Sequence, residues 1–140
     1  MGKIAIVYWS GTGNTEAMAN AVSDGATKAG AQAELINAAD FNAMSASGYS
    51  AIAFGCPAMG SEVLEETEFQ PMWDVVKGML GSKPVGLFGS YGWGGGEWME
   101  SWKDDASSNG VNVVSTIIAN EAPDDAAIAE CEALGKTLAG

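Results

Sequence analysis

The amino-acid sequence predicts an α/β fold, namely a doubly wound, five-stranded parallel sheet with helices on both faces. Short apolar runs alternate with helical patterns five times along the chain. The first apolar run is nearly continuous, as expected of a parallel strand that is buried on both faces. Repeated strand–helix units join their strands by right-handed crossovers, which place helices on both faces of one sheet. The 140 residues contain no linker or repeat, so we expect a single domain over residues 1–140.

The N-terminal part of the chain predicts two strands and one long helix. We expect a strand over residues 3–9 and a helix over residues 14–29, followed by Gly30 at a position that favours glycine. A second, weaker strand is expected at residues 32–37 and fits an edge of the sheet. Residues 38–49 are small and polar, which predicts either a short helix or a loop.

The middle of the chain predicts a strand, a loop and an amphipathic helix. The strand is expected over residues 49–55 and is ended by Cys56-Pro57, and a loop follows over residues 58–66. The segment Thr67–Gln70 fits a capping box, with Pro71 early in the helix, where its missing N–H costs nothing. The apolar stripe of this helix comprises Phe69, Met72, Trp73, Val76 and Met79 or Leu80.

The C-terminal part of the chain predicts two further strand–helix units. A strand is expected over residues 84–89, and a helix runs from Glu97 to the stop signal Asn109-Gly110. The fifth strand is expected over residues 111–119. The last helix begins near Asp124-Asp125, where acidic side chains interact favourably with the helix dipole.

Several large or sulfur-containing residues are assigned to the core. We expect Trp9, Trp73 and Trp102 to be buried. Cys56 and Cys131 are far apart and form no C-x-x-C pair, so we expect two buried free thiols in a reducing compartment. Because the chain has no histidine, it has too few soft ligands for a zinc site, and no metal is expected.

The net charge of −12 comes from 18 acidic residues against six lysines. It argues against binding of nucleic acid or of an anionic membrane surface. It permits docking to basic protein partners, although acidity that only maintains solubility explains the composition as well. The sequence has no apolar run of about 18 residues and no signal-peptide cleavage site, so we expect a cytoplasmic protein.

Glycine-rich or aromatic segments follow four of the expected strands, at residues 10–15, 57–62, 89–96 and 119–124. Because the carboxyl ends of parallel strands meet at one edge of a sheet, these four segments should converge on one ligand site. Asn120-Glu121 either rims that site or only forms a turn at the end of its strand.

The first of these segments is Ser10-Gly11-Thr12-Gly13-Asn14-Thr15, which lies between a strand and a helix. Hydroxyl and amide donors, together with the backbone N–H groups of a helix N-terminus, favour a bound phosphate. The segment is neither a Walker A loop nor G-x-G-x-x-G. It lacks a basic residue, which suits a terminal monophosphate better than a triphosphate with metal. The alternative is a well-capped turn that binds nothing.

The next two segments carry groups suited to a planar ring. Met59 could cover one face of such a ring, Gly60 could change its peptide orientation, and Glu62 could accept a hydrogen bond from a ring N–H. Tyr91 and Trp93 lie among glycines and are suited to stacking. The alternative for the Met59 segment is a surface loop with the methionine folded inward as a gap filler.

Together these segments resemble the flavodoxins, and the short-chain, clostridial-type members in particular. Ser10–Thr15 is similar to the family's phosphate loop, Ala58–Gly60 to its first ring loop and Gly89–Trp93 to its second. The resemblance covers essentially the whole chain. It implies a flavodoxin-like sheet in the order 2-1-3-4-5 with non-covalent FMN at the switch point. One departure is Pro57, which cannot supply the hydroxyl found there in some members.

The resemblance also implies roles for individual residues. The phosphate would be bound by Ser10, Thr12, Asn14 and Thr15. Met59 and Trp93 would sandwich the ring, and the Gly60 carbonyl would accept a hydrogen bond from N5–H of the semiquinone. Glu62 would bind N3–H, and the backbone of Gly89 the pyrimidine edge. The full set expected to contact FMN is Ser10, Gly11, Thr12, Gly13, Asn14, Thr15, Pro57, Ala58, Met59, Gly60, Glu62, Gly89, Ser90, Tyr91, Gly92 and Trp93.

The implied function is that of a monomeric, low-potential one-electron carrier that shuttles FMN between semiquinone and hydroquinone. Glu62, Glu65, Glu66 and Glu68 are expected near the ring edge, where low-potential oxidoreductases would dock. At about 10 Å and an effective dielectric of about 40–80, each charge disfavours an anionic ring by roughly 0.4–0.8 kcal/mol. Three or four charges then contribute about 1–3 kcal/mol, or roughly 50–130 mV for one electron.

Two other functions remain open on the same fold. An FMN-dependent NAD(P)H:quinone reductase would need room for nicotinamide against the ring, which a stacked Trp93 would block. A flavodoxin-like activator of a radical enzyme would use the same cofactor with a dedicated partner. A phospho-receiver domain is disfavoured, because the first strand ends in Tyr8-Trp9-Ser10 without an acidic pair for magnesium.

Overall fold

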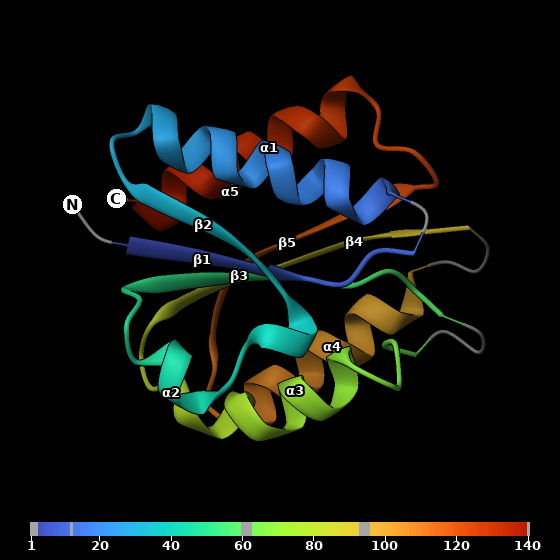
Figure 1. The fold of residues 1–140 in the computed structure, drawn as a ribbon. Helices are drawn as coiled ribbons and strands as arrows, with labels where there is room; N and C mark the ends of the chain where they lie inside the picture. Colours follow the sequence, from blue (N-terminus) through green and yellow to red (C-terminus); the bar gives the residue numbers. More distant parts are fainter. Residues whose placement is uncertain (1–2, 12, 60–62, 93–95, 140) are drawn as a thin grey trace.

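Five parallel strands form one sheet in the order β2-β1-β3-β4-β5 (Figure 1). The computed structural model describes residues 3–11, 13–59, 63–92 and 96–139. The strands are β1 (Lys3–Tyr8), β2 (Gln32–Asn37), β3 (Ala51–Gly55), β4 (Pro84–Tyr91) and β5 (Asn112–Asn120). The strand order and the parallel pairing confirm the predicted α/β fold.

Helices cover both faces of this sheet. Figure 1 shows α1 and α5 on one face and α2, α3 and α4 on the other. The helices are α1 (Asn14–Lys28), α2 (Ala43–Ala46), α3 (Phe69–Val76), α4 (Glu97–Ser108) and α5 (Asp125–Ala139). Two short 3₁₀ turns, η1 (Ala38–Asp40) and η2 (Lys77–Met79), complete the order. Residues 38–49 thus form two short helical segments.

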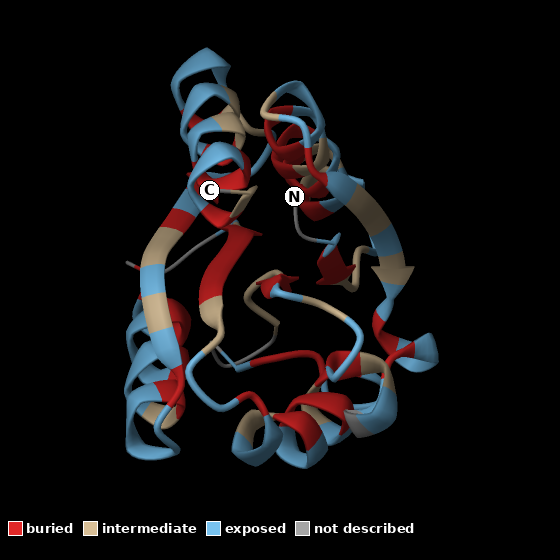
Figure 2. Ribbon diagram, turned by 90° about the vertical axis from the view of Figure 1, so that its left-hand side faces the viewer, coloured by how far each residue is buried: buried red, intermediate tan, exposed pale blue. Residues whose placement is uncertain are grey.

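Two apolar layers hold the helices to the sheet, and β1 contributes to both. Ile4 and Ile6 pack toward α1 and α5, whereas Ala5 and Val7 belong to the layer under α3 and α4. All four side chains are fully buried. Successive residues of a strand face opposite sides, so a strand covered on both faces is apolar at every position. Figure 2 shows the buried residues turned inward from the helices onto the sheet.

Three strands end at residues other than those predicted, and β3 and β5 also begin later than predicted, at Ala51 and Asn112. β1 ends at Tyr8, so Trp9 follows the strand and is only half-buried, which corrects its assignment to the core. β4 and β5 continue together, since Ser90 pairs with Ala119 and Tyr91 with Asn120. The extra residues of β4 come from a segment that its glycine content had suggested to be a loop.

The expected capping box at Thr67–Gln70 is wrong. α3 begins at Phe69, and its N-cap residue Glu68 makes no side-chain cap. The cap comes instead from the buried carboxylate of Glu65, which accepts hydrogen bonds from three backbone N–H groups at the start of the helix. Glu65 is therefore not one of the solvent-exposed charges that the sequence placed at the ring edge.

Other assignments to the core are confirmed. Trp73 and Trp102 are buried, and so is Trp98. Both cysteines are free thiols in the interior, Cys56 at the end of β3 and Cys131 in α5. At the start of α5, Asp124 Oδ1 accepts a hydrogen bond from the Ala127 N–H at 2.8 Å, as expected of an acidic cap. Within the described residues, no helix is long and apolar enough to cross a membrane.

Candidate functional site

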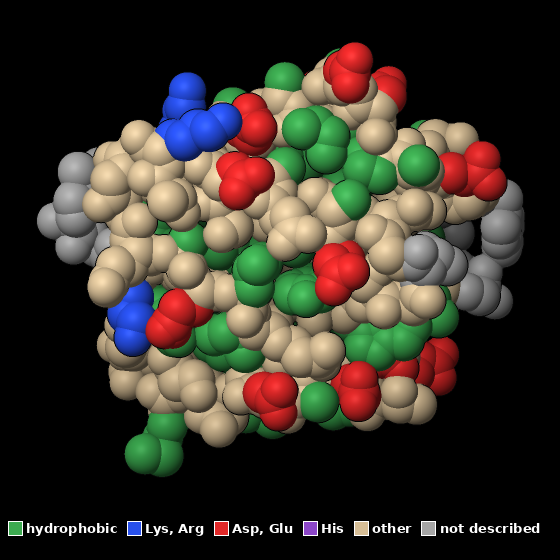
Figure 3. Space-filling view, turned by 45° about the horizontal axis from the view of Figure 1, so that its top comes forward, with side chains coloured by type: hydrophobic (Ala, Val, Ile, Leu, Met, Phe, Trp, Pro, Cys, Tyr) green, Lys and Arg blue, Asp and Glu red, His purple; other side chains and the backbone are tan. Residues whose placement is uncertain are grey.

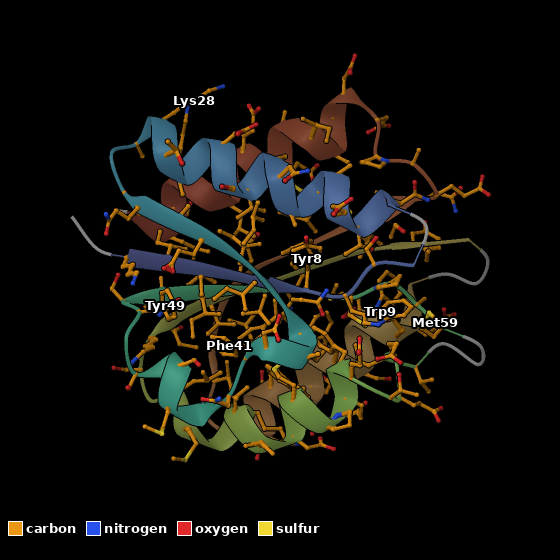
Figure 4. The ribbon with its side chains drawn as sticks, in the orientation of Figure 1. Tyr8, Trp9, Lys28, Phe41, Tyr49 and Met59 are labelled. Atoms are coloured by element: carbon orange, nitrogen blue, oxygen red, sulfur yellow. The ribbon has the colours of Figure 1, made fainter. Side chains whose placement is uncertain are left out.

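A pocket of about 280 Å³ lies at the carboxyl edge of the sheet. Its lining residues come from all four segments that were predicted to converge. They are Trp9, Gly11, Asn14, Pro57, Ala58, Met59, Ser90, Tyr91, Gly92 and Glu121. In Figure 4, Trp9 and Met59 both lie at the end where the strands finish, while Lys28 and Tyr49 lie toward the opposite end. The four segments thus converge at one edge as predicted, and the binding of a ligand there stays a prediction.

The turn between β1 and α1 presents backbone donors toward this edge. Gly13 is the N-cap residue, with φ of 93°, a left-handed conformation that favours glycine. The N–H groups of Asn14 and Thr15 precede the first intrahelical hydrogen bond, from Ala17 N–H to the Gly13 carbonyl. They therefore form the positive end of the helix dipole, where an anion is stabilised. Thr12 lies outside the described residues.

Ser10 stabilises this turn from outside the helix. Its Oγ accepts hydrogen bonds from the N–H groups of Gly13 at 3.1 Å and Glu16 at 3.3 Å. The hydroxyl proton is a further donor, because a serine hydroxyl accepts and donates at once. Ser10 can therefore hold the loop and contact an anion in the same arrangement.

Thr15 connects the first segment to the third. Its side chain is buried, and its Oγ1 accepts a hydrogen bond from the N–H of Ser90 at 3.4 Å. Ser90 belongs to β4 and is itself buried. Two segments that are 75 residues apart in the chain are thus joined directly beneath the pocket.

The second and third segments are joined by backbone hydrogen bonds. The N–H of Cys56 donates to the Phe88 carbonyl at 3.1 Å, and the N–H of Ala58 donates to the Ser90 carbonyl at 3.0 Å. Between these two bonds lies Gly89, where an added Cβ would sit 2.1 Å from the carbonyl oxygen of Cys56. Gly89 is needed for the close approach of β3 and β4. It is buried and does not line the pocket, so the pairing of its backbone with a ring stays a prediction.

Met59 is half-buried and lines the pocket rather than filling a gap in the core. It forms an isolated antiparallel bridge with Val63, with N–H to carbonyl distances of 2.9 and 3.0 Å. The bridge closes the loop that follows β3. Gly60 and Glu62, like Trp93, lie outside the described residues, and their predicted roles stay predictions.

Two lining residues were not predicted as site residues. Trp9 was assigned to the core, although its position directly before Ser10 at the end of β1 already indicated the carboxyl edge. For Glu121, the sequence is compatible both with the rim of the site and with a simple turn at the end of the strand. Glu121 has φ of 56° and is the only non-glycine residue with positive φ in the described part of the chain. Its N–H donates to the Tyr91 carbonyl at 2.7 Å, which continues the β4–β5 pairing past the strand ends.

Charged side chains are distributed unequally between the two ends of the sheet. The first turns of α1, α4 and α5 carry acidic residues, and the last turns of α1 and α5 carry Lys28 and Lys136. Each arrangement complements the helix dipole, and these helix starts lie at the pocket edge. On the face drawn in Figure 3, the lysines gather at the left, and acidic side chains extend to the right-hand end.

One acidic residue of this edge interacts with the sheet. The Tyr8 hydroxyl donates to Glu16 Oε2 at 3.3 Å. Burial raises the pKa of Tyr8, and the negative charge of Glu16 raises it further, so this phenol is protonated across the neutral range.

Comparison with known proteins gives a consistent result. The sequence model of the flavodoxin family matches residues 6–135. The flavodoxin of Megasphaera elsdenii is 48% identical over 136 residues, which cover 97% of this chain and 98% of that protein. The flavodoxin of Clostridium beijerinckii is 43% identical over 136 residues, covering 96% and 97%.

Solved structures agree with the sequence comparison. The solution structure of two-electron reduced Megasphaera elsdenii flavodoxin superimposes with a TM-score of 0.90 at 48% identity, covering 97% of this chain and 98% of the other. A flavodoxin from the domain Archaea has a TM-score of 0.83 at 27% identity, covering 98% and 96%.

Proposed function

This chain belongs to the flavodoxin family and is an FMN-binding electron-transfer protein rather than an enzyme, and we propose that its carboxyl-edge pocket is where it holds FMN. The observation that carries the proposal is the convergence of a helix N-terminus and an apolar, aromatic-lined pocket on one edge of the sheet. FMN has an anionic phosphate at one end and a planar ring at the other. The helix N-terminus suits the phosphate, and the apolar pocket suits the ring.

The phosphate is assigned to the turn before α1. The N–H groups of Asn14 and Thr15 and the hydroxyls of Ser10, Thr12 and Thr15 supply neutral donors. The sequence has no basic residue between Lys3 and Lys28, so the dipole of α1 is the nearby source of positive potential. Gly11 and Gly13 complete the turn, since neither carries a side chain that would obstruct the phosphate.

The ring is assigned to the space between Met59 and the β4 end. Met59 and Tyr91 line the described part of this space, and Trp9 lies beside them. Pro57, Ala58, Ser90 and Gly92 also line it. We assign Gly60, Glu62 and Trp93 to the same ring environment by their place in the sequence.

Bound FMN supplies a ring that takes up and releases electrons one at a time. The chain acts on that ring through charge. Glu121 lines the pocket, and the exposed Glu66 and Glu68, which follow the ring loop in the sequence, are assigned to the same edge, where they disfavour a further negative charge. Lys3, Lys28, Lys77, Lys83 and Lys136 lie at strand starts or helix ends, which the topology places away from the pocket. We therefore infer a low potential for the last electron.

We also infer how the protein meets its redox partners. A surface that is acidic around the pocket attracts a partner with a basic patch and orients it toward the ring. Residues 1–140 would act as a single FMN-binding unit, as a monomer in the cytoplasm. The partners are low-potential oxidoreductases whose docking rate should fall as the salt concentration rises.

Titration of the apoprotein with FMN and with riboflavin tests the site. Riboflavin lacks the phosphate, so its dissociation constant should be larger by at least about tenfold, the equivalent of one charge-assisted contact. Equal affinities would contradict the phosphate assignment, and an apoprotein that takes up neither compound would contradict the site.

Reductive titration of the holoprotein tests the proposed redox behaviour. We expect a blue neutral semiquinone at half reduction, and replacement of Glu62, Glu66 and Glu68 by glutamine should raise the potential of the second step. An unchanged potential would contradict the charge argument. NADPH added to the holoprotein should leave the flavin oxidised, whereas bleaching would indicate a reductase.

A further inference from the structure

The loop after β3 is joined at its two ends by a contact between Cys56 and Glu65. The N–H of Glu65 donates to Cys56 Sγ at 3.3 Å, and both residues are buried. Cys56 is itself held to the sheet, because its N–H donates to the Phe88 carbonyl and its carbonyl accepts the Trp98 Nε1–H at 3.2 Å. The contact therefore attaches the far end of the loop to a fixed point.

The Glu65 side chain attaches the same end of the loop to α3. Its carboxylate accepts hydrogen bonds from the N–H groups of Thr67 at 2.8 Å, Glu68 at 2.7 Å and Phe69 at 2.9 Å, and from the Thr67 hydroxyl. Phe69 is completely buried between α3 and the sheet. A carboxylate at a helix N-terminus with several N–H donors is a strong, charge-assisted cap.

The titration of Glu65 agrees with this geometry. Burial by itself would raise the pKa of this carboxyl, but the hydrogen bonds from the Thr67 hydroxyl and from the backbone N–H groups bring its pKa below the ordinary value. Glu65 therefore carries its charge at neutral pH inside the protein.

The proposed ring loop lies between Cys56 and Glu65. Pro57, Ala58 and Met59 line the pocket, and the Met59–Val63 bridge closes the loop upon itself. Ordering a free loop on binding costs conformational entropy, so a loop that is already held in the binding conformation binds more tightly.

We propose that Glu65 is a positioning residue for the FMN ring. Its carboxylate fixes residue 65 on α3, and the contact of residue 65 with Cys56 then holds Pro57, Ala58 and Met59 in the binding conformation before FMN arrives. The proposal rests on the proposed function, in which Met59 and its neighbours contact the ring. Glu65 touches neither the pocket nor the flavin, and it acts only through the backbone of the loop. Its charge is replaceable only by a group that accepts all three N–H bonds.

The test compares Glu65→Gln with Glu66→Gln. Both changes remove one negative charge from adjacent residues, but Glu66 is exposed and outside the cap. We expect the dissociation constant of oxidised FMN to rise by about tenfold or more in Glu65→Gln and by less than about twofold in Glu66→Gln. In the apoproteins, hydrogen exchange at the Met59 and Val63 amides should accelerate only in Glu65→Gln.

A loss of general stability must be separated from a loss of positioning. Leu138→Ala, in the last turn of α5 away from the pocket edge, should lower stability by leaving a cavity without touching the loop, so it should leave FMN affinity and the two amides unchanged. If Glu65→Gln does not fold, Glu65→Asp gives the same comparison, since its shorter side chain cannot reach all three N–H groups. Equal affinities and equal exchange in the Glu65 and Glu66 variants would overturn the proposal. If the unmodified protein binds no FMN, the proposed function fails instead, and the amide exchange still tests the loop.

Discussion

Gly135 of α5 packs directly against the backbone of Val22 in α1. A Cβ added at Gly135 would lie 2.1 Å from the Val22 carbonyl oxygen, and one added at Gly25 would lie 2.0 Å from the Glu132 carbonyl oxygen. The contact is reciprocal, because each helix places one glycine against the backbone of the other helix. The two helices that cover one face of the sheet therefore meet backbone to backbone.

Gly135→Ala should destabilise the protein although alanine is the better helix former. The propensity gain is about 1 kcal/mol, but the methyl group would push the helices apart, and such overpacking costs about 1–3 kcal/mol or more. We expect the free energy of unfolding in urea to fall by about 1–2 kcal/mol. Gly78→Ala is the matched control, because a Cβ there meets nothing within 4 Å. A Gly135 variant as stable as the control would contradict this packing account.

Gly89→Ala should disturb the pocket by separating the ends of β3 and β4. The added Cβ would meet the Cys56 carbonyl, between the hydrogen bonds that join Cys56 to Phe88 and Ala58 to Ser90. We expect a loss of about 2 kcal/mol in apoprotein stability together with weaker FMN binding. Gly92→Ala should leave apoprotein stability nearly unchanged, since a Cβ at that position has open space. Urea unfolding of the two apoproteins distinguishes them, and equal stabilities would be the unexpected result.

Asp105 should make stability depend on acid pH. Its carboxylate accepts a hydrogen bond from Trp73 Nε1 at 2.8 Å and forms an ion pair with Lys77 at 3.0 Å. Burial would raise the pKa of Asp105, but these two partners bring it below the ordinary value. The contribution of Asp105 is therefore present at neutral pH and is lost as the pH falls through its lowered folded-state pKa.

The measurement is the unfolding free energy of the apoprotein between pH 7 and pH 3. Asp105→Asn should be less stable than the unmodified protein at pH 7, by about 0.5–1 kcal/mol because the pair is partly exposed. The difference should shrink toward pH 3. Asp104→Asn, a change at the exposed neighbouring residue, should leave the pH profile parallel to that of the unmodified protein. A constant difference between Asp105→Asn and the unmodified protein at all pH values would argue against the linkage.

Ser10→Ala should weaken the binding of FMN more than the binding of riboflavin. The change removes the acceptor for the Gly13 and Glu16 N–H groups and the hydroxyl proposed to reach the phosphate. Loss of such a capping group costs about 1 kcal/mol, and loss of a contact to a charged phosphate adds about 1.5–3 kcal/mol. Fluorescence titration should show a fall in FMN affinity of roughly tenfold or more, with Ser23→Ala as the control. Equal losses for both flavins would place the phosphate elsewhere.

Much of the fold could be predicted because its signals are local. The apolar run before Ser10, the stripe of α3 and the acidic start of α5 each depend on residues within a few positions of one another. The position of the site also followed, since parallel strands that end in glycine-rich or aromatic segments must bring those segments to one edge.

The errors concern hydrogen bonds, strand ends and strand pairing, which residue type and spacing do not define. Thr67 and Gln70 have the right spacing for a capping box, but the Thr67 N–H already donates to the Glu65 carboxylate and the Gln70 N–H to the Glu65 backbone carbonyl. Trp9 is apolar and follows an apolar run, which predicts burial, yet the end of β1 leaves it beside the pocket. The strand-like ends of β4 and β5 depend on their pairing with each other and not on the glycine content of either.

The sequence by itself determined most of the strands and helices, their alternation and the edge at which the candidate site lies, because side-chain periodicity and turn chemistry act over a few residues. Only the tertiary structure decided that Thr15 bonds to Ser90, that Glu121 takes a left-handed conformation where its N–H meets the Tyr91 carbonyl, and that glycines bring α1 and α5 together. These features depend on which backbone groups remain unpaired, and how closely two backbones approach, once segments far apart in the chain have packed. A local sequence pattern predicts neither the unpaired backbone groups nor the distance between two backbones, since both depend on the segment that packs against them.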